Sequence, residues 1–351
     1  MTYRVTIRPT GHELTVNAGE SVLDAALRQG YALPYGCRNG TCAACLGELR
    51  SGSVSYPEGH RPPGLTEAGE AAGQALLCQA QPTTDLEVEI QEVEEARDIA
   101  VRTLPVRLVD TTALAHDVTQ LYLKLPAAER LQFLAGQYVD LLLKDGRRRS
   151  FSLANPPTVD DHLELHVRRV PGGRFSDQLL GDMKPKAVLR FEGPLGSFYL
   201  RDSPDRPAIL MAGGTGFAPI KSMVEQAIAS GQRRPLHIFW GVRAWRDLYM
   251  GELAAQWAAE HEWIDFTPVL SHPEDSDAWD GATGFVHEAV VARYPDLSNH
   301  EVYMSGPPPM IEAGRNTFRA AGLARDALFF DSFDYAPDAV QGMMAAGIDP
   351  A

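Results

Sequence analysis

The sequence lacks long apolar runs and contains few cysteines. No stretch of its 351 residues approaches the ~20 apolar residues that a membrane-spanning helix requires. The first residues, MTYRVTIRPTGHELTV, lack the apolar centre of a signal peptide. We therefore expect no membrane association and a cytoplasmic location, where thiols stay reduced and disulfides are rare.

Positive charge is also scarce, and its shortage is uneven along the chain. The 46 acidic residues outnumber the 32 lysines and arginines, so the formal net charge is −14. This charge argues against nucleic acid as a partner. Residues 1–95 contain 13 acidic residues, 6 arginines and no lysine, a net charge of −7. We interpret this span either as an aid to solubility or as a negative docking face for a partner protein.

The length of the chain suits two or three domains, and the first of them has a mixed pattern. Residues 1–95 open with two alternating segments that predict a β-hairpin. A helical spacing of apolar residues follows in GESVLDAALRQG, and TDLEVEIQEV is typical of a last strand. This combination predicts a small α+β domain.

The rest of the chain changes pattern twice. Residues 100–202 contain short strand-like runs separated by turn signals, which is typical of an antiparallel β-barrel or sandwich. Residues 203–335 alternate strand and helix patterns, which predicts a parallel α/β sheet. Residues 336–351 form a C-terminal tail without a clear pattern.

The few cysteines are concentrated in one loop. Cys37, Cys42 and Cys45 lie within nine residues, and Cys78 follows after 32 more. This C-x4-C-x2-C…C spacing is typical of plant-type [2Fe–2S] clusters, whereas a zinc ribbon would need a second C-x-x-C pair. We predict that all four thiolates bind a cluster; zinc or unliganded thiols are the alternatives.

The residues between the cysteines suit such a cluster. Gly36 and Gly40 allow the backbone to take positive φ and wrap closely around the sulfur atoms. Backbone N–H groups can then point at the sulfurs and tune the potential, and we expect them from Arg38, Asn39, Gly40, Thr41, Ala43 and Ala44.

These motifs carry a resemblance to a known family. Residues 1–95 resemble a plant-type, β-grasp-like ferredoxin domain, and the whole chain resembles the ferredoxin–NAD(P)H reductase superfamily members that carry such a domain at the N-terminus. Within that superfamily the sequence is most similar to CDP-6-deoxy-glucoseen reductase-like proteins. The resemblance implies a reductase component that feeds electrons to oxygenases or deoxysugar dehydratases.

The segment RRRSFSLAN resembles the R-x-[Y/F]-[S/T] flavin motif of that family. Strand alternation places Arg149 and Phe151 on one side of a strand and Ser150 and Ser152 on the other. Arg149 can pair with the flavin diphosphate, Phe151 offers an aromatic face, and Ser152 can form a hydrogen bond near the flavin N5. A basic edge strand is the alternative interpretation.

A second segment, HVRRVPGGRFSDQLL, resembles the strand, glycine-rich turn and helix start that follow in the family. The resemblance places His166, Val167 and Arg168 along the flavin and the turn at Gly172 and Gly173. We expect Ser176 at a helix N-cap, where free N–H groups can bind phosphate. FAD is favoured over FMN because the domain order resembles that of FAD-containing members.

A glycine-rich loop between a strand and a helix resembles the G-G-T/S-G-x-A-P nucleotide loop of the family, although its spacing is not G-x-G-x-x-G. In AILMAGGTGFAPIKSM, the residues that approach a diphosphate at the helix N-terminus are Gly213, Gly214, Thr215 and Gly216. The resemblance places Gly306 and Pro307 opposite the nicotinamide, next to Ser305, where many relatives have cysteine.

Two further segments concern the choice of nucleotide and the cover of the flavin. The resemblance places Arg243 and Asp247 near the adenosine ribose; the acidic Asp247 favours NADH, whereas Arg243 and Arg246 could meet the 2′-phosphate of NADPH. In FFDSFDYAPD, either Phe333 or Tyr335 is the aromatic residue expected to shield the flavin.

We therefore predict a reductase that moves electrons from NADH through FAD and a [2Fe–2S] cluster to an acceptor protein, and we expect a monomer. Hydride transfer needs alignment, not an acid–base pair. The acceptor is expected to be a Rieske oxygenase, a di-iron oxygenase or a deoxysugar dehydratase. One alternative is a stand-alone reductase of free flavin, cobalamin or quinone, and another is a redox-sensing regulator.

Overall fold

A computed structural model gives the structure of the chain, and it describes every residue except 171–175, 177–182, 184–185, 204, 335–336 and 346–351. The chain divides into two compact units. The first comprises Met1–Ala100 with Gly196–Phe198, and the second comprises Val101–Leu195 with Tyr199–Ala351. Within the described part of the chain, no helix has the length and apolarity that crossing a membrane requires.

The first unit is built on a five-stranded mixed sheet with the strand order β2-β1-β7-β3-β5. Its strands are β1 (Thr2–Arg8), β2 (Glu13–Asn17), β3 (Leu46–Ser51), β5 (Gln74–Leu76) and β7 (Leu86–Glu89). The expected hairpin is present, because β1 pairs with β2 in antiparallel register, and β1 also pairs in parallel with β7. A separate short pair joins β4 (Val54–Ser55) to β6 (Gln81–Pro82).

Helix α1 (Val22–Arg28) packs on this sheet and positions the last cysteine. The Ser21 side chain caps the helix by accepting from the Asp24 N–H, and four apolar residues of α1 are buried. The first N–H groups of α1 donate to the carbonyls of Leu77 and Ala80, on either side of Cys78. The chain also forms a short helix α2 (Glu67–Ala71), which the sequence did not lead us to expect.

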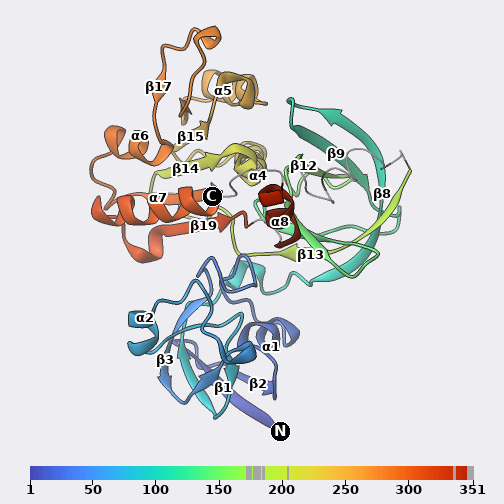
Figure 1. The fold of residues 1–351 in the computed structure, drawn as a ribbon, viewed down its shortest axis with the longest axis vertical. Helices are drawn as coiled ribbons and strands as arrows, with labels where there is room; N and C mark the ends of the chain where they lie inside the picture. Colours follow the sequence, from blue (N-terminus) through green and yellow to red (C-terminus); the bar gives the residue numbers. More distant parts are fainter. Residues whose placement is uncertain (171–175, 177–182, 184–185, 204, 335–336, 346–351) are drawn as a thin grey trace. The chain divides into compact units, whose positions relative to one another are not determined.

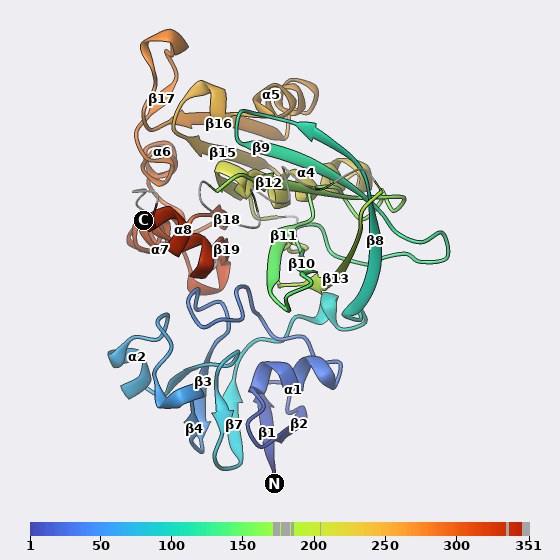
Figure 2. The same cartoon turned by 45° about the vertical axis from the view of Figure 1, so that its right-hand side comes forward.

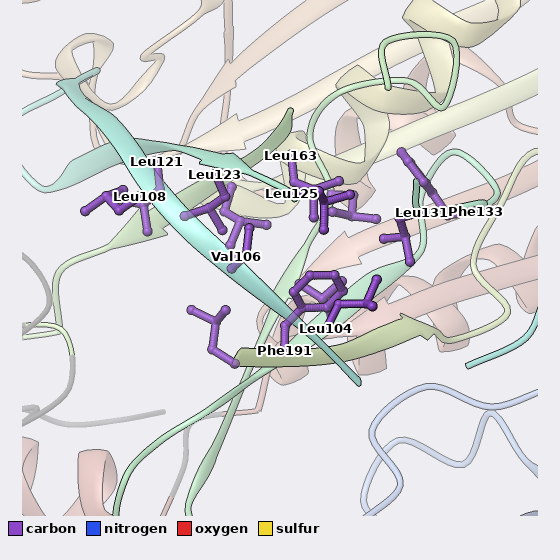
Figure 3. Packing of buried hydrophobic residues seen from close by; sticks show 14 of the residues in the cluster. Leu104, Val106, Leu108, Leu121, Leu123, Leu125, Leu131, Phe133, Leu163 and Phe191 are labelled. Carbon is purple, nitrogen blue, oxygen red and sulfur yellow. The ribbon is translucent and has the colours of Figure 1, made fainter. Parts of the chain in front are cut away.

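The first part of the second unit is an antiparallel six-stranded sheet with the order β11-β10-β13-β8-β9-β12. Its strands are β8 (Arg102–Ala113), β9 (Val118–Lys124), β10 (Tyr138–Leu142), β11 (Arg148–Ser152), β12 (Leu163–Arg168) and β13 (Val188–Leu195). A bridge between Leu153 and Leu165 joins the two edge strands and closes the sheet into a barrel. Leucine, valine and phenylalanine side chains from several strands fill its interior (Figure 3).

The second part is a parallel sheet with the order β17-β16-β15-β14-β18-β19. Its strands are β14 (Ala208–Gly213), β15 (Leu236–Val242), β16 (Ile264–Leu270), β17 (Ala282–Thr283), β18 (Glu301–Gly306) and β19 (Leu328–Ser332). Its helices are α4 (Phe217–Ser230), α5 (Gly251–Glu260), α6 (Val286–Arg293) and α7 (Pro308–Ala320). Helices α4 and α5 cover one face and α6 and α7 the other (Figures 1 and 2).

The strand order reverses between β14 and β18, and ligands of such sheets bind at this switch point, beyond the carboxyl ends of the strands. The loops that follow β14 and β18 therefore lie side by side at the expected site. The sequence prediction of an α+β domain, an antiparallel barrel and a parallel α/β sheet is confirmed.

Part of the C-terminal tail, whose sequence has no clear pattern, has regular structure. The segment Pro337–Ala345 forms a helix, α8. Its pattern is weak because the helix has only nine residues and contains Gly342, a residue that lowers helix propensity. Pro337 at its first position suits a helix start, and this signal was available in the sequence.

Candidate functional site

The four cysteines of the first unit form two pairs. Cys37 and Cys42 contact each other, because each backbone N–H donates to the other's Sγ at 3.4 Å. Cys45 and Cys78 are within hydrogen-bonding reach through their thiols. All four are free of disulfides, and Cys42, Cys45 and Cys78 are buried. The predicted residues are thus assembled from the loop and from the segment beneath α1.

This pairing fits a [2Fe–2S] cluster better than a single metal ion. In the part of the chain that the structure describes, no three Cys, His, Asp or Glu side chains converge to hold one ion. A [2Fe–2S] cluster has two irons and four thiolate ligands, so two pairs of thiols meet its demand. Within each pair, one thiol stabilises the other's thiolate. The hydrogen bond from Cys42 lowers the pKa of Cys37 to about 5, and the pKa of Cys42 is correspondingly raised.

Two of the six expected backbone N–H groups of the loop contact sulfur, whereas the Thr41 N–H donates to Asn39 Oδ1 instead. The Ala44 N–H donates to Cys42 Sγ at 3.5 Å, and the Asn39 backbone hydrogen-bonds Cys37. The positive φ values differ in part from expectation. Gly40 has φ +85°, but Arg38 and Ala43 take the other positive values, at +60° and +61°, in place of Gly36. Non-glycine residues in this region are strained, and such strain is concentrated at functional sites.

The strand β11 has the alternation that the flavin motif requires. Arg149 and Phe151 are half-buried on one side, and Phe151 packs against the barrel core. On the other side, the Ser150 hydroxyl donates to Asp140 Oδ1 at 2.6 Å. Ser152 is buried, and its hydroxyl lies 3.5 Å from Asp331 Oδ2 on β19. Asp331 was missed by sequence reasoning because only folding brings β19 to the end of β11.

An aspartate carboxylate contacts Arg149, the residue expected to hold the flavin diphosphate, and also Arg147. Arg149 Nη2 donates to Asp338 Oδ1 and Oδ2, both at 2.6 Å, and Arg147 Nη1 donates to Asp338 Oδ2 at 2.5 Å. Asp338 lies in the first turn of α8. The contact shows that the two guanidinium groups converge on one anion. The arrangement therefore fits a diphosphate. In this structure the Asp338 carboxylate takes the position that the diphosphate would occupy.

The strand β12 directs its side chains in different ways. Val167 belongs to the barrel core. The His166 ring is fully buried, with Nε2 2.8 Å from Glu164 Oε1 and Nδ1 3.0 Å from the Tyr249 hydroxyl. Burial lowers the pKa of His166, so the ring is neutral and its side chain is committed to these two partners. Only the backbone of His166 is left to face a cofactor.

Ser176, which was expected at a helix N-cap, forms hydrogen bonds to the backbone of Val170. The Ser176 hydroxyl accepts from the Val170 N–H at 3.0 Å and donates to the Val170 carbonyl at 3.1 Å, so it fastens the end of the β12 segment. The glycines 172 and 173, expected to form the turn, lie outside the described residues.

Arg168 lies against the nucleotide loop. A Cβ atom on Gly214 would be 2.6 Å from Arg168 Nη1, so the glycine is needed for the close approach of this guanidinium. Gly214 also has φ +53°, which disfavours other residues. Arg168 Nε is 3.1 Å from Asp117 Oδ2, which holds the side chain in place. Arg168, which the family resemblance places along the flavin, thus contacts the loop that the resemblance gives to the nicotinamide nucleotide.

The glycine-rich loop is shaped by close backbone contacts. A Cβ atom on Gly216 would lie 1.9 Å from the Ser305 carbonyl oxygen, and one on Gly213 would lie 2.6 Å from Met310 Sδ. Thr215 is half-buried between them, in the short turn Gly214–Gly216 that precedes α4. Among the described residues, no side chain caps the start of α4, and the Phe217 N–H donates back to the carbonyls of Gly214 and Thr215.

The loop after β18 completes this end of the sheet. Ser305 is fully buried, and its hydroxyl has no hydrogen-bond partner among the described residues. A buried hydroxyl without a partner is costly, and it fits a position that a bound ligand completes. Gly306 has φ +152°, and its carbonyl accepts from the Phe333 N–H at 2.9 Å. Pro307 follows as the extended residue before α7. Tyr335, the other aromatic residue expected to cover the flavin, is not among the described residues.

The residues expected at the adenosine ribose have mixed roles. Arg243 is exposed after β15. Asp247 Oδ2 instead accepts from the Ala244 N–H at 3.1 Å, so this carboxylate stabilises the turn formed by Trp245–Asp247. Arg246 forms an ion pair with Glu274 at 3.0 Å. Glu274 was not singled out in the sequence, and nothing in its local pattern marks it.

Comparison with known protein families matches each part of the chain to a separate domain family. The 2Fe-2S iron-sulfur cluster binding domain matches residues 5–83, the Oxidoreductase FAD-binding domain matches residues 105–199, and the Oxidoreductase NAD-binding domain matches residues 210–316. These matches confirm the predicted cofactors, a [2Fe–2S] cluster, FAD and NAD, and the predicted oxidoreductase class.

Similar proteins match along nearly the whole chain. The CDP-6-deoxy-L-threo-D-glycero-4-hexulose-3-dehydrase reductase of Yersinia pestis is 40% identical over 333 residues, which cover 95% of this chain and 99% of that protein. The phenol 2-monooxygenase reductase component DmpP of Pseudomonas sp. strain CF600 is 36% identical, covering 96% of each. The crystal structure of the Amycolatopsis cytochrome P450 reductase GcoB has a TM-score of 0.77 and 34% identity, covering 95% of this chain and 99% of that one.

Proposed function

Since the chain belongs to the family of reductase components that join a 2Fe-2S domain to FAD-binding and NAD-binding domains, we propose that it delivers electrons from NADH to a partner dehydratase or oxygenase. When bound, NADH supplies a hydride, and FAD with the [2Fe–2S] cluster supplies carriers that release its two electrons one at a time. The partner carries out the chemistry on the final substrate.

The chain's own residues bind and align these groups. Cys37, Cys42, Cys45 and Cys78 would hold the cluster through two pairs of thiolates. Arg149 and Arg147 would bind the FAD diphosphate in place of the Asp338 carboxylate. The N-terminus of α4 and the Arg168 guanidinium would bind the nucleotide diphosphate.

The reacting end of the site is proposed to lie where three strands meet. Ser152 at the end of β11 is close to Asp331 on β19, and the Phe333 N–H donates to Gly306, next to Ser305 on β18. These side chains would exclude water and hold the two ring systems in contact, because hydride transfer depends on alignment. The Ser305 hydroxyl would find there the partner that it lacks among the described residues.

One observation carries this proposal. The guanidinium of Arg168, on barrel strand β12, lies in the space that a side chain on Gly214 of the nucleotide loop would occupy. The contact supports the proposal that strand β12 and the nucleotide loop face one site, as a transfer between their ligands requires. A barrel and a nucleotide domain with separate ligands would not need this contact.

The nucleotide is proposed to be NADH. Glu274 pairs with Arg246, and the Asp247 carboxylate lies close by in the same turn, so a 2′-phosphate would meet negative charge and an arginine that is already paired. We also propose a cytoplasmic location, since the four cysteines proposed as cluster ligands must stay reduced. The monomeric state stays a prediction.

Steady-state kinetics with different acceptors test the function. The protein, reconstituted with iron, sulfide and FAD, is given NADH with cytochrome c, free FMN, cobalamin or quinone. We expect cytochrome c to be reduced fastest, at a rate that falls with added salt, because the acidic first unit steers a basic protein. Faster reduction of a small acceptor would favour a stand-alone reductase. Slow turnover with every acceptor would favour a redox sensor.

A further inference from the structure

A buried ion pair fastens the nucleotide helix to the flavin strands. Lys221, one turn into α4, is almost fully buried, and its Nζ donates to the Ala154 carbonyl at 3.2 Å and to Glu164 Oε2 at 3.2 Å. Ala154 is the second residue after β11, and Glu164 lies on β12. A third bond, to Glu225 Oε2 at 3.0 Å, stays within α4. The three donors of the ammonium group are therefore all used.

Ser222, the next residue of α4, also bonds to the connection between β11 and β12. The fully buried Ser222 hydroxyl donates to the Asn155 carbonyl at 2.7 Å. Asn155 in turn accepts from the Glu164 N–H at 2.8 Å and donates to the Val159 carbonyl at 2.9 Å. The connection between β11 and β12 is thus locked internally and held to α4 at adjacent positions.

A series of contacts leads from this ion pair to the glycine-rich loop. Glu164 accepts from the neutral His166 ring, and the Tyr249 hydroxyl donates to the other ring nitrogen. The Tyr249 ring packs edge-on against Trp240, with centroids 5.0 Å apart. The Trp240 indole N–H donates to the Gly214 carbonyl at 3.0 Å. Direct contacts therefore lead from Lys221 through β12 and back to the loop that precedes α4.

A buried charged pair is an expensive way to join two elements, because each charge loses its hydration. Apolar residues could fill the same space, but they would allow sliding, since apolar contacts are not directional. Hydrogen bonds with fixed donors and acceptors define one position. The two motifs joined here are those whose relative placement decides the rate of hydride transfer.

We propose that Lys221 and Glu164 are positioning residues, which fix the flavin strands against the nucleotide loop and so align nicotinamide with flavin. This inference rests on the proposed function. Neither residue needs to touch a cofactor. Their effect is to hold β11, β12 and the Gly214–Gly216 turn in one register, through Ala154 on one side and through His166, Tyr249 and Trp240 on the other.

The test replaces the pair without leaving an unpaired charge. The double variant Lys221→Met/Glu164→Gln removes the bridge, and Glu225→Gln is the matched control because it removes a bond of Lys221 that does not leave α4. Flavin reduction by NADH is followed under anaerobic conditions at increasing NADH. In the double variant we expect the limiting rate to fall about tenfold or more, because misalignment acts on the transfer step. The NADH dissociation constant and the FAD content should change by less than about twofold, since the binding residues remain.

Hydrogen–deuterium exchange on FAD-free protein provides a readout that does not depend on turnover. We expect the peptide containing residues 213–217 to exchange faster in the double variant and to be unchanged in Glu225→Gln. Unchanged exchange and an unchanged limiting rate, with only a lower melting temperature, would overturn the proposal and leave a structural ion pair. If the unaltered protein fails to reduce FAD with NADH, the proposed function fails, and the exchange experiment alone decides whether the pair positions the loop.

Discussion

The cysteine loop of the first unit and the proposed flavin–nucleotide site of the second are built in opposite ways. Three of the four cysteines lie within nine residues, and the N–H groups that contact their sulfurs come from the same loop. In the second unit, Arg149 meets Asp338 across 189 positions, and Ser152 meets Asp331 across 179. A site made by one loop can be changed alone, whereas a site made by several strands depends on how those strands pack.

The largest effect is expected from the cysteine loop. Cys45→Ser removes one thiolate of the Cys45–Cys78 pair, so the cluster loses a ligand. We expect reduction of cytochrome c by NADH to be abolished, while reduction of ferricyanide, which flavin alone supports, is retained. Visible absorbance of the variant should show FAD without the cluster bands. Equal loss of both activities would contradict the separation of the two sites.

The next largest effect is expected in the nucleotide loop. A Cβ atom on Gly216 would lie 1.9 Å from the Ser305 carbonyl oxygen, which is backbone and cannot turn aside. Gly216→Ala should therefore displace the loop and abolish NADH-dependent flavin reduction while the protein keeps its FAD. Gly251→Ala is the matched control, because its nearest neighbour is at an ordinary 3.4 Å. A normal NADH affinity in Gly216→Ala would show that the loop does not bind the nucleotide.

A smaller effect is expected at the flavin diphosphate. Arg149→Ala removes a charge-assisted contact, and we expect FAD affinity to fall by about 2 kcal/mol, roughly thirtyfold. Fluorescence of FAD released on dilution measures this loss. Arg130→Ala, which removes an exposed arginine that pairs with Asp160, is the matched control and should leave FAD affinity unchanged. Full FAD retention in Arg149→Ala would place the diphosphate elsewhere.

The smallest effect is expected from the tail helix, and it has the opposite sign. Asp338→Asn removes the carboxylate that FAD must displace from Arg147 and Arg149. FAD should then bind a few times more tightly, as expected for the loss of one partly exposed competing ion pair. The same dilution experiment measures it. Weaker binding would mean that α8 holds the arginines in place for the cofactor.

How far the sequence predicts each site follows from this difference in construction. The cysteine spacing predicts the cluster, which the matched iron–sulfur domain supports, because three of the four proposed ligands are close along the chain. Arg149 and Phe151 are both half-buried on β11, as the predicted alternation requires, whereas Ser150 is exposed and Ser152 is buried. The sequence did not predict that Asp338 meets Arg149, that Arg168 faces Gly214, or that Lys221 bridges to Glu164. Each of these contacts joins elements that are distant in the sequence, and no local pattern records the partner.

The measurement that tests the central claim most directly is anaerobic stopped-flow absorbance of the reconstituted protein mixed with NADH and, separately, with NADPH. The account predicts that the flavin bands bleach first, that the cluster bands decrease afterwards, and that NADH acts faster than NADPH. Bleaching of the flavin while the cluster bands stay unchanged would contradict it, because the two sites would then not form one path for electrons.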